Sequence, residues 1–367
     1  MKLAVFLITV LLLPIFGTNL PKSGTSRAMD VVEKAVDEGA FPGAVALVGK
    51  GNRIVAKEAF GYAMVVPEKK EMKIETIFDL ASLTKPIATA TSIMILVDRG
   101  LLRLNDPVTL LIPEFGKNGK EGITIRQLLT HTSGLPDWEP FYEYCSSYDE
   151  VISAVCNVSL RYKPGEEYLY SDLGYMTLGE IVRIVSGERL DVFAHNNIFE
   201  PLGMKDTMFN PQSKDRCAAT ELCPWRNRVI VGEVHDENAY AMGGVSGHAG
   251  LFSTAEDLFI FAQMMLNEGQ YRGKRILSPY AVRAMTQTQN DYDLGWMTKS
   301  ESSSDGDLLS DRSYGHTGFT GTSIWIDPEA GLTIILLTNR VHPTRENNAH
   351  IRIRALFANA AAGELSQ

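Results

Sequence analysis

Apolar and polar positions near the N-terminus follow first a helical and then a strand-like pattern. Residues 28–38 carry apolar side chains three and four positions apart, which predicts a helix with one buried face. Two apolar runs, 41–50 and 53–62, follow on either side of a Gly-Asn pair, and this arrangement predicts a β-hairpin.

The C-terminal part of the chain has the same kinds of pattern in reverse order. The apolar runs 321–327 and 332–338 are separated by a Pro-Glu-Ala-Gly turn and predict two further strands. Residues 345–362 then predict a final helix.

The middle of the chain is mostly helical in pattern. Residues 175–185 have the spacing of an amphipathic helix, and Ser253-Thr-Ala-Glu256 predicts a capping box before a helix at 257–266. Glycines are frequent just before this helix, which predicts a loop or tight turn there.

Strands at both ends of the chain with helices between them indicate one sheet built from both termini. We expect its strands within residues 28–80 and 310–367, and a mostly helical region at about 100–290. The predicted class is therefore α+β. The 367 residues, 45% of them hydrophobic, are ordinary for a soluble globular protein.

Charge and the first residues limit the partners and the compartment. The 35 basic and 44 acidic side chains give a net charge of −9, and no long basic run is present, which argues against nucleic acid as a partner. Lys2, the apolar run 3–16 and a polar segment up to residue 24 have the layout of an export signal. The sequence thus predicts a signal peptide at 1–24 and a catalytic domain at 25–367. An uncleaved signal would be the only membrane tether.

The four cysteines permit several arrangements in an exported chain. Cys145, Cys156, Cys217 and Cys223 allow up to two disulfides, with three possible full pairings, or free thiols. No Cys-x-x-Cys spacing is present, so a zinc or redox centre is not expected.

Ser82-Leu83-Thr84-Lys85 is the first segment with a chemical implication. In a helix, side chains three positions apart share one face, so Ser82 and Lys85 would lie a single turn apart. A serine hydroxyl needs an adjacent base to become a nucleophile. Lys85 would serve as that base if its pKa is lowered; if it stays charged, it would lower the pKa of another base.

Two further segments supply candidate partners. In Tyr170-Ser171-Asp172, a phenol near the Lys85 ammonium would gain a stabilised phenolate, able to take the Ser82 proton. In His316-Thr317-Gly318-Phe319, Gly318 would let a substrate approach the backbone closely. His316 would bind a substrate carboxylate when charged or donate a hydrogen bond when neutral.

These three segments, in this order, resemble the serine β-lactamase and penicillin-binding-protein superfamily. The similarity is greatest to the branch with class C β-lactamases, D-Ala-D-Ala carboxypeptidases, D-aminopeptidases and family VIII esterases. It implies an antiparallel sheet flanked by helices, a helical subdomain, and an acyl-enzyme at Ser82, with Lys85 and Tyr170 sharing proton transfer. It also implies an oxyanion hole made by the amides of Ser82 and Phe319.

The chain differs from this branch at two positions. Many members have Asn where this chain has Asp172, and class C β-lactamases have Lys where it has His316. A carboxylate at Asp172 would repel an anionic substrate unless it is paired with Lys85 or protonated. Both differences favour a peptidase, amidase or esterase over an efficient β-lactamase.

A last resemblance concerns the segments 339–345 and 234–239. They are similar to a bacterial subgroup that removes peptide from muramic acid. Arg340, His342 and Arg345 would form a cationic patch for a carboxylate of a muropeptide, or else a solvated loop with a helix-capping arginine.

The remaining histidines suggest no additional chemistry. His235-Asp236-Glu237 lacks a second histidine at ligand spacing, so no metal is expected there. His131 and His248 are expected to make structural hydrogen bonds.

We therefore interpret the chain as an exported serine hydrolase that needs no cofactor. Ser82, Lys85 and Tyr170 are its predicted catalytic residues, and Asp172, His316, Thr317, Gly318 and Phe319 its predicted substrate-binding and oxyanion residues. The expected substrate is a small molecule or an amide in cell-wall peptide, with a carboxypeptidase or a muramoyl-peptide amidase as the activity. A carboxylesterase, a β-lactamase and a penicillin-binding receptor with little turnover are the alternatives.

Overall fold

The computed structural model describes residues 26–286, 292–300 and 304–365. The predicted signal peptide lies outside these ranges. Within them, no helix combines the length and the apolar character that crossing a membrane requires.

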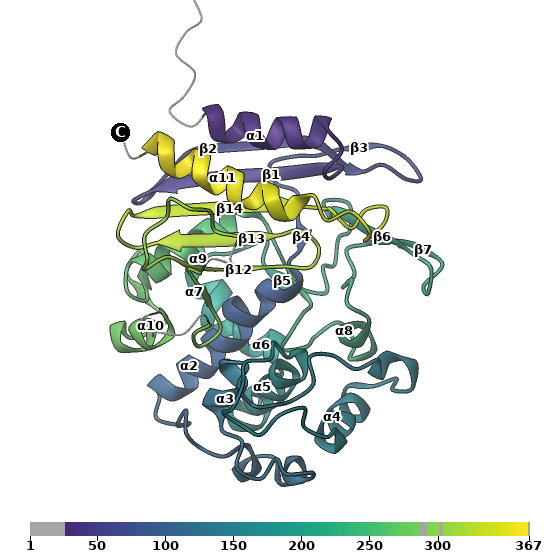
Figure 1. The fold of residues 1–367 in the computed structure, drawn as a ribbon, viewed down its shortest axis with the longest axis vertical. Coiled ribbons are helices and arrows are strands. Elements are labelled where there is room, and N and C mark those ends of the chain that lie inside the picture. The colour runs from purple at the N-terminus through teal and green to yellow at the C-terminus, as the bar shows by residue number, and fades with distance from the viewer. Residues whose placement is uncertain (1–25, 287–291, 301–303, 366–367) are drawn as a thin grey trace, which may run out of the picture.

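A seven-stranded antiparallel sheet lies in the upper part of the molecule as drawn in Figure 1. Because β14 pairs with β1, strands from the two ends of the chain lie side by side, as the sequence predicts. In spatial order, the strands are β11 (Met297–Thr298), β12 (Tyr314–Thr317), β13 (Ser323–Asp327), β14 (Leu332–Thr338), β1 (Gly43–Lys50), β2 (Arg53–Met64) and β3 (Lys70–Glu71).

Two helices cover one face of this sheet, α1 (Ser26–Asp37) and α11 (His350–Leu365), which lie next to each other in Figure 1. Ala46 and Leu336 point toward them, whereas the neighbouring Leu47 and Leu337 point into the core on the other face. This alternation follows from the two-residue repeat of a strand. The helix α9 (Ala255–Leu266) packs on that second face.

The middle of the chain forms a helical region below α9 (Figure 1). Its helices are η1 (Ala81–Leu83), η2 (Lys85–Ala90), α2 (Thr91–Asp98), η3 (Val108–Leu110), η4 (Pro113–Gly116), α3 (Ile125–Leu129), η5 (Phe141–Glu143), α4 (Tyr148–Asn157), α5 (Asp172–Ser186), α6 (Leu190–Ala194), η6 (His195–Phe199), α7 (Glu200–Leu202), α8 (Glu237–Ala241) and α10 (Pro279–Thr286).

The predicted α+β class is confirmed, but the middle is not purely helical. A three-stranded sheet has the order β4 (Phe78–Asp79), β8 (Leu251–Ser253), β5 (Met208–Phe209). Two hairpins accompany it, β6 (Ala219–Cys223) with β7 (Arg228–Val231) and β9 (Gln270–Tyr271) with β10 (Lys274–Arg275). β11 also lies before residue 310, outside the predicted strand ranges.

Four predicted helix starts differ from the structure by two to five residues, and two of them have a clear structural reason. Thr254, not Ser253, caps α9 by accepting from the Asp257 amide, because Ser253 is still in β8 and bonds Thr207. The last helix starts at His350, since the side chain of Arg345 is held by Glu221 of β6 and Glu237 of α8.

The structure also decides between disulfides and free thiols for the four cysteines. All four cysteines are buried free thiols. They act as small apolar side chains of the core.

Candidate active site

The segment that carries Ser82 joins the small sheet to the helical region. Ala81 has φ 46° and begins η1, a 3₁₀ turn, so this start differs from the regular helix that the sequence predicts. In a 3₁₀ turn, side chains at i and i+3 lie in line. Lys85 Nζ therefore donates to Ser82 Oγ over 3.0 Å.

Lys85 is completely buried and surrounded by groups that favour its charged form. Its Nζ lies 2.7 Å from Asp172 Oδ1 and 3.3 Å from the His248 carbonyl oxygen. It also lies over the Tyr170 ring, 4.7 Å from the centroid. Burial alone would lower the pKa of Lys85, but Asp172 and Tyr170 raise it above its ordinary value. Of the two predicted roles, the structure supports a charged lysine acting on another group.

Tyr170 is the group on which that charge acts. Burial raises the pKa of Tyr170, while Lys85 and a hydrogen bond with Ser82 oppose that rise. Lys85 thus stabilises the phenolate as the sequence predicts, but burial outweighs it, and the phenol is neutral at rest.

The start of α5 places Tyr170 and Asp172 together. Ser171 caps this helix: its hydroxyl accepts from the Gly174 amide and donates to the Pro136 carbonyl over 2.6 Å. The Ser171 amide donates to His131 Nδ1 over 2.9 Å. Because Nδ1 accepts, and because burial holds the pKa of His131 well below its ordinary value, His131 is neutral. Its role here is structural.

His316 is buried and neutral too. Its Nδ1 donates over 2.7 Å to the Thr317 carbonyl, which can only accept, so Nε2 accepts from the Tyr292 hydroxyl over 3.0 Å. Burial, together with repulsion from Lys85, lowers the pKa of His316 to about 3. A charged His316 that binds a substrate carboxylate is therefore not supported at neutral pH.

The end of β12 is tied to the nucleophile segment by backbone and hydroxyl contacts. A Cβ on Gly318 would lie 2.4 Å from the Leu80 carbonyl oxygen, so the close approach that this glycine permits is to the protein itself. Thr322 Oγ1 donates to the same carbonyl over 3.0 Å, and Thr320 Oγ1 donates to the Asp79 carbonyl over 2.7 Å. These contacts place Phe319 next to Ser82.

A cavity of about 310 Å³ opens at Ser82. It brings together half of the predicted site residues, since Tyr170, Asp172 and Phe319 also line it. Lys85, His316, Thr317 and Gly318 do not line it. Its lining residues are Ala81, Ser82, Trp138, Tyr170, Asp172, His235, Asp236, Glu237, His248, Ala249, Phe319 and Arg345.

One part of this lining has the separations of a metal site. In the described part of the chain, Asp172, Asp236 and His248 offer ligand atoms within 4.8 Å of one another. Lys85 already neutralises Asp172, and the His248 ring bonds Asp236 over 2.8 Å and Ser246 over 2.8 Å. Asp172 is thus paired with a cation and both nitrogens of His248 have partners, which fits a metal ion poorly.

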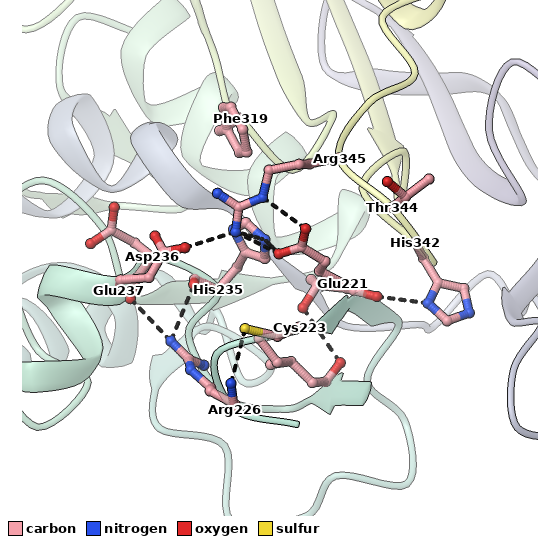
Figure 2. Close-up of polar contacts among 12 residues, drawn as sticks. Glu221, Cys223, Arg226, His235, Asp236, Glu237, Phe319, His342, Thr344 and Arg345 are labelled. Atoms are coloured by element: carbon pink, nitrogen blue, oxygen red, sulfur yellow. Dashed lines mark hydrogen bonds and ion pairs between the residues drawn. The ribbon is translucent and has the colours of Figure 1, made fainter. Parts of the chain in front are cut away.

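On another wall of the cavity, an ion-pair cluster surrounds Arg345 (Figure 2). Arg345 Nε donates to Glu221 Oε1 over 2.8 Å, and Nη2 donates to Glu237 Oε1 over 2.7 Å. His235 Nε2 lies 3.2 Å from Glu221 Oε2, and its ring stacks on Phe319 at 5.7 Å between centroids. Arg345 is thus held by two carboxylates.

The predicted cationic patch does not form. Arg345 is paired, and the buried Arg340 donates to the Phe319 and Arg345 carbonyls, each over 2.7 Å. The ring of His342 bonds the Thr220 carbonyl and the Val65 amide (2.6 and 2.9 Å). Arg340 and His342 therefore hold the backbone in place, and Arg345 lines the cavity only as a paired cation.

Trp138, Asp236 and Glu237 are among the lining residues that sequence reasoning did not place at the site. Trp138 carried no signal beyond its position after the 131–136 loop. Asp236 and Glu237 were weighed as metal ligands and belong to the segment 234–239, whose resemblance assigned them no role. Asp236 and Glu237 reach the cavity because they lie at the start of α8. This helix has only five residues, which is too short for a recognisable helical pattern in the sequence.

Comparisons with known proteins identify the family of this chain. A family model described as Beta-lactamase matches residues 29–359. An N-acetylmuramyl-L-alanine amidase of Bacillus subtilis (strain 168) is 37% identical over 353 residues, covering 85% of this chain and 80% of the relative. A protein of Escherichia coli (strain K12), provisionally named D-alanyl-D-alanine carboxypeptidase, is 34% identical, covering 85% and 81%.

Among solved structures, EstCE1, a hydrolase with promiscuous acyltransferase activity, superimposes with a TM-score of 0.76. The alignment covers 93% of this chain and 98% of EstCE1, at 23% identity. Identity this low supports the fold alone.

Proposed function

The chain belongs to the beta-lactamase family of serine hydrolases, and on this basis we propose that it is an exported amidase that separates peptide from muramic acid. The sequence-based expectation of the family is confirmed, and so is that of a serine hydrolase. The amide bond, the export and the acyl-enzyme at Ser82 are our proposals.

The charge of the cavity is the observation that favours an amidase over a carboxypeptidase. Asp172, Asp236 and Glu237 line it, whereas Arg345 is the one lysine or arginine among the described lining residues. A carboxypeptidase or a β-lactamase must bind a carboxylate close to the scissile bond, and an unpaired cation binds such an anion most strongly. Neither the neutral His316 nor the paired Arg345 provides one.

The muramoyl amide suits this environment better. Its acyl side is a neutral sugar ether with hydroxyl and acetamido groups, and its nearest carboxylate lies one residue beyond the leaving alanine. The relative from Bacillus subtilis, named as an amidase of this kind, supports the same choice.

In the proposed mechanism, the Ser82–Lys85–Tyr170 cluster first loses one proton, leaving a Tyr170 phenolate beside the Lys85 ammonium. The phenolate takes the Ser82 proton as Oγ attacks the carbonyl carbon. The amides of Ser82 and Phe319, both at the cavity, would stabilise the oxyanion.

Collapse of the tetrahedral intermediate breaks the C–N bond, and Tyr170 gives its proton to the leaving amine. A water then attacks the acyl-Ser82 ester and passes a proton to the Tyr170 phenolate. The phenol returns a proton to Ser82 Oγ, which completes the cycle.

Purified muropeptides test the proposal directly. Mass spectrometry should show free peptide and peptide-free muramic acid with the wild type, and neither product with Ser82→Ala. Loss of a terminal D-alanine would indicate a carboxypeptidase instead. Turnover of simple esters alone would indicate an esterase. Without muropeptide cleavage, stable labelling by a fluorescent penicillin would indicate a receptor, and short-lived labelling would indicate a β-lactamase.

A further inference from the structure

Four aromatic side chains form a row that starts at the cavity. The ring centroids of Trp138 and Tyr142 are 6.2 Å apart, those of Tyr142 and Trp225 are 4.9 Å apart, and those of Trp225 and Tyr240 are 5.8 Å apart. We refer to these four residues as the aromatic strip. They come from the loop before η5, from η5 itself, from the β6–β7 turn and from α8.

The aromatic strip is open to solvent. Trp138, Trp225 and Tyr240 are 39%, 48% and 38% exposed. Such large apolar side chains are seldom grouped on the surface of a monomer unless they bind something. Trp and Tyr offer a large contact area with little loss of side-chain freedom, so they are effective binding residues.

The side chain of Arg226 holds two rings of the aromatic strip in place. Arg226 lies 4.0 Å from the Tyr240 ring centroid and 5.4 Å from that of Trp225. Its guanidinium donates to the Val234 and His235 carbonyls over 2.7 and 3.2 Å, under the ion-pair cluster in Figure 2. The rings are therefore preorganised by contacts that a ligand would not need to form.

Two contacts connect the strip with the cavity. Asn238 of α8 accepts from the Tyr142 amide over 3.0 Å and donates to the Glu139 carbonyl over 2.9 Å, which joins α8 to η5. α8 itself places Glu237 in the cavity and Tyr240 in the strip. A substrate that occupies the cavity can thus extend along the strip without leaving the protein.

From these observations we infer that the aromatic strip is a glycan subsite, at which sugar rings of the substrate stack while its amide lies at Ser82. The identity of the sugar as part of a cell-wall glycan depends on the proposed function. A sugar ring has a face of C–H groups that packs on an aromatic ring, and hydroxyls at its edge that bond polar side chains. The strip offers both, because its rings are flanked by Glu139, Glu143 and Glu237.

A binding experiment tests the subsite without catalysis. In the Ser82→Ala protein, titration with the uncharged disaccharide N,N′-diacetylchitobiose, which carries the same acetamido groups, should change the tryptophan fluorescence and saturate. Adding Trp225→Ala should weaken this binding by about tenfold, the usual effect of removing a central aromatic contact. Trp225→Phe should recover part of it. Tyr280→Ala, which removes an exposed tyrosine in α10, is the control and should have no effect.

Kinetics then separate this inference from the proposed function. With Trp225→Ala, the KM for a disaccharide-peptide should rise about tenfold relative to the KM for a sugar-free ester. Disaccharide binding without muropeptide cleavage would contradict the proposed function but would still support the glycan subsite. Muropeptide cleavage with equal KM changes for both substrates, or tighter binding of an apolar peptide than of the disaccharide, would overturn the subsite.

Discussion

At the scale of single residues, charge pairing distinguishes this site from a generic serine–lysine pair. Lys85 has a carboxylate on one side and a phenol on the other, so its ammonium form is favoured despite complete burial. In the proposed mechanism the general base is then Tyr170, whose pKa is raised by burial. One proton has to leave the cluster before Ser82 can attack.

This order of events predicts an unusual pH profile. Since the acid form of the cluster is inactive and the pKa of Tyr170 is raised, log kcat/KM should still increase with pH above 8. Asp172 raises the pKa of both Lys85 and Tyr170, so Asp172→Asn should move the profile toward lower pH by about one unit. A rate profile measured with a sugar-free ester checks both statements. A plateau already reached below pH 7 would mean that a carboxylate is the base.

A second prediction at this scale concerns Glu221. Burial alone would raise the pKa of Glu221, but hydrogen bonds from His235 and Arg345 hold it at about 2, against an ordinary 4.5. A lowered pKa stabilises the fold above pH 4.5, and this contribution is lost as pH falls through 2. Glu221→Gln should therefore lower the free energy of unfolding by about 2 kcal/mol at pH 7.

Urea unfolding at pH 7 and at pH 3 would measure this difference, which should be smaller at pH 3. Glu38→Gln serves as the control, because Glu38 forms an exposed pair with Lys34 and should change the free energy little. If both variants lose the same unfolding free energy, the ion-pair cluster around Arg345 does not stabilise the fold.

At the scale of elements, the site depends on how the loop before β8 meets α5. Gly247 lies so close to α5 that a Cβ would be 1.9 Å from the Tyr175 carbonyl oxygen. Thr89 of η2 donates to the Gly247 carbonyl over 2.6 Å, and the next residue, His248, offers its carbonyl to Lys85. Packing of three segments thus sets the position of Lys85.

Gly247→Ala should therefore reduce both stability and activity. The added methyl must displace either the loop or α5, which should cost about 3 kcal/mol of unfolding free energy. It should also lower kcat, since the His248 carbonyl would move away from Lys85. Thermal unfolding and muropeptide turnover check this, with Gly122→Ala as control because its Cβ would meet no atom within 4 Å. Unchanged activity in Gly247→Ala would contradict this account of Lys85.

At the scale of the whole molecule, the cavity lies where β12, the nucleophile segment and the loops around α8 come together. Charges from distant parts of the chain add up there, and carboxylates outnumber cations among the described lining residues. Their combined field disfavours anionic substrates. We suggest that this field, more than any single residue, separates this protein from β-lactamases.

Removing one of these carboxylates should make the protein more reactive toward an anionic β-lactam. Glu237→Gln should increase the rate of acylation by a fluorescent penicillin by roughly threefold to tenfold at low ionic strength, and less at high salt. Glu38→Gln, with the same charge change far from the cavity, should leave the rate unaltered. If the two variants react at the same rate, the electrostatic explanation fails.

The sequence alone determined the elements and the chemistry that depend on local spacing. A helical face, a two-residue strand repeat and a serine three positions before a lysine are properties of neighbouring residues, so α1, β1, β2, β13, β14 and the Ser82–Lys85 contact could be predicted. Only the tertiary structure decided which charges remain available. Arg345 is neutralised by Glu221 and Glu237, more than 100 residues earlier, and His316 loses its charge through burial against Tyr292. Pairing and desolvation depend on what the fold brings together, and no local pattern encodes them.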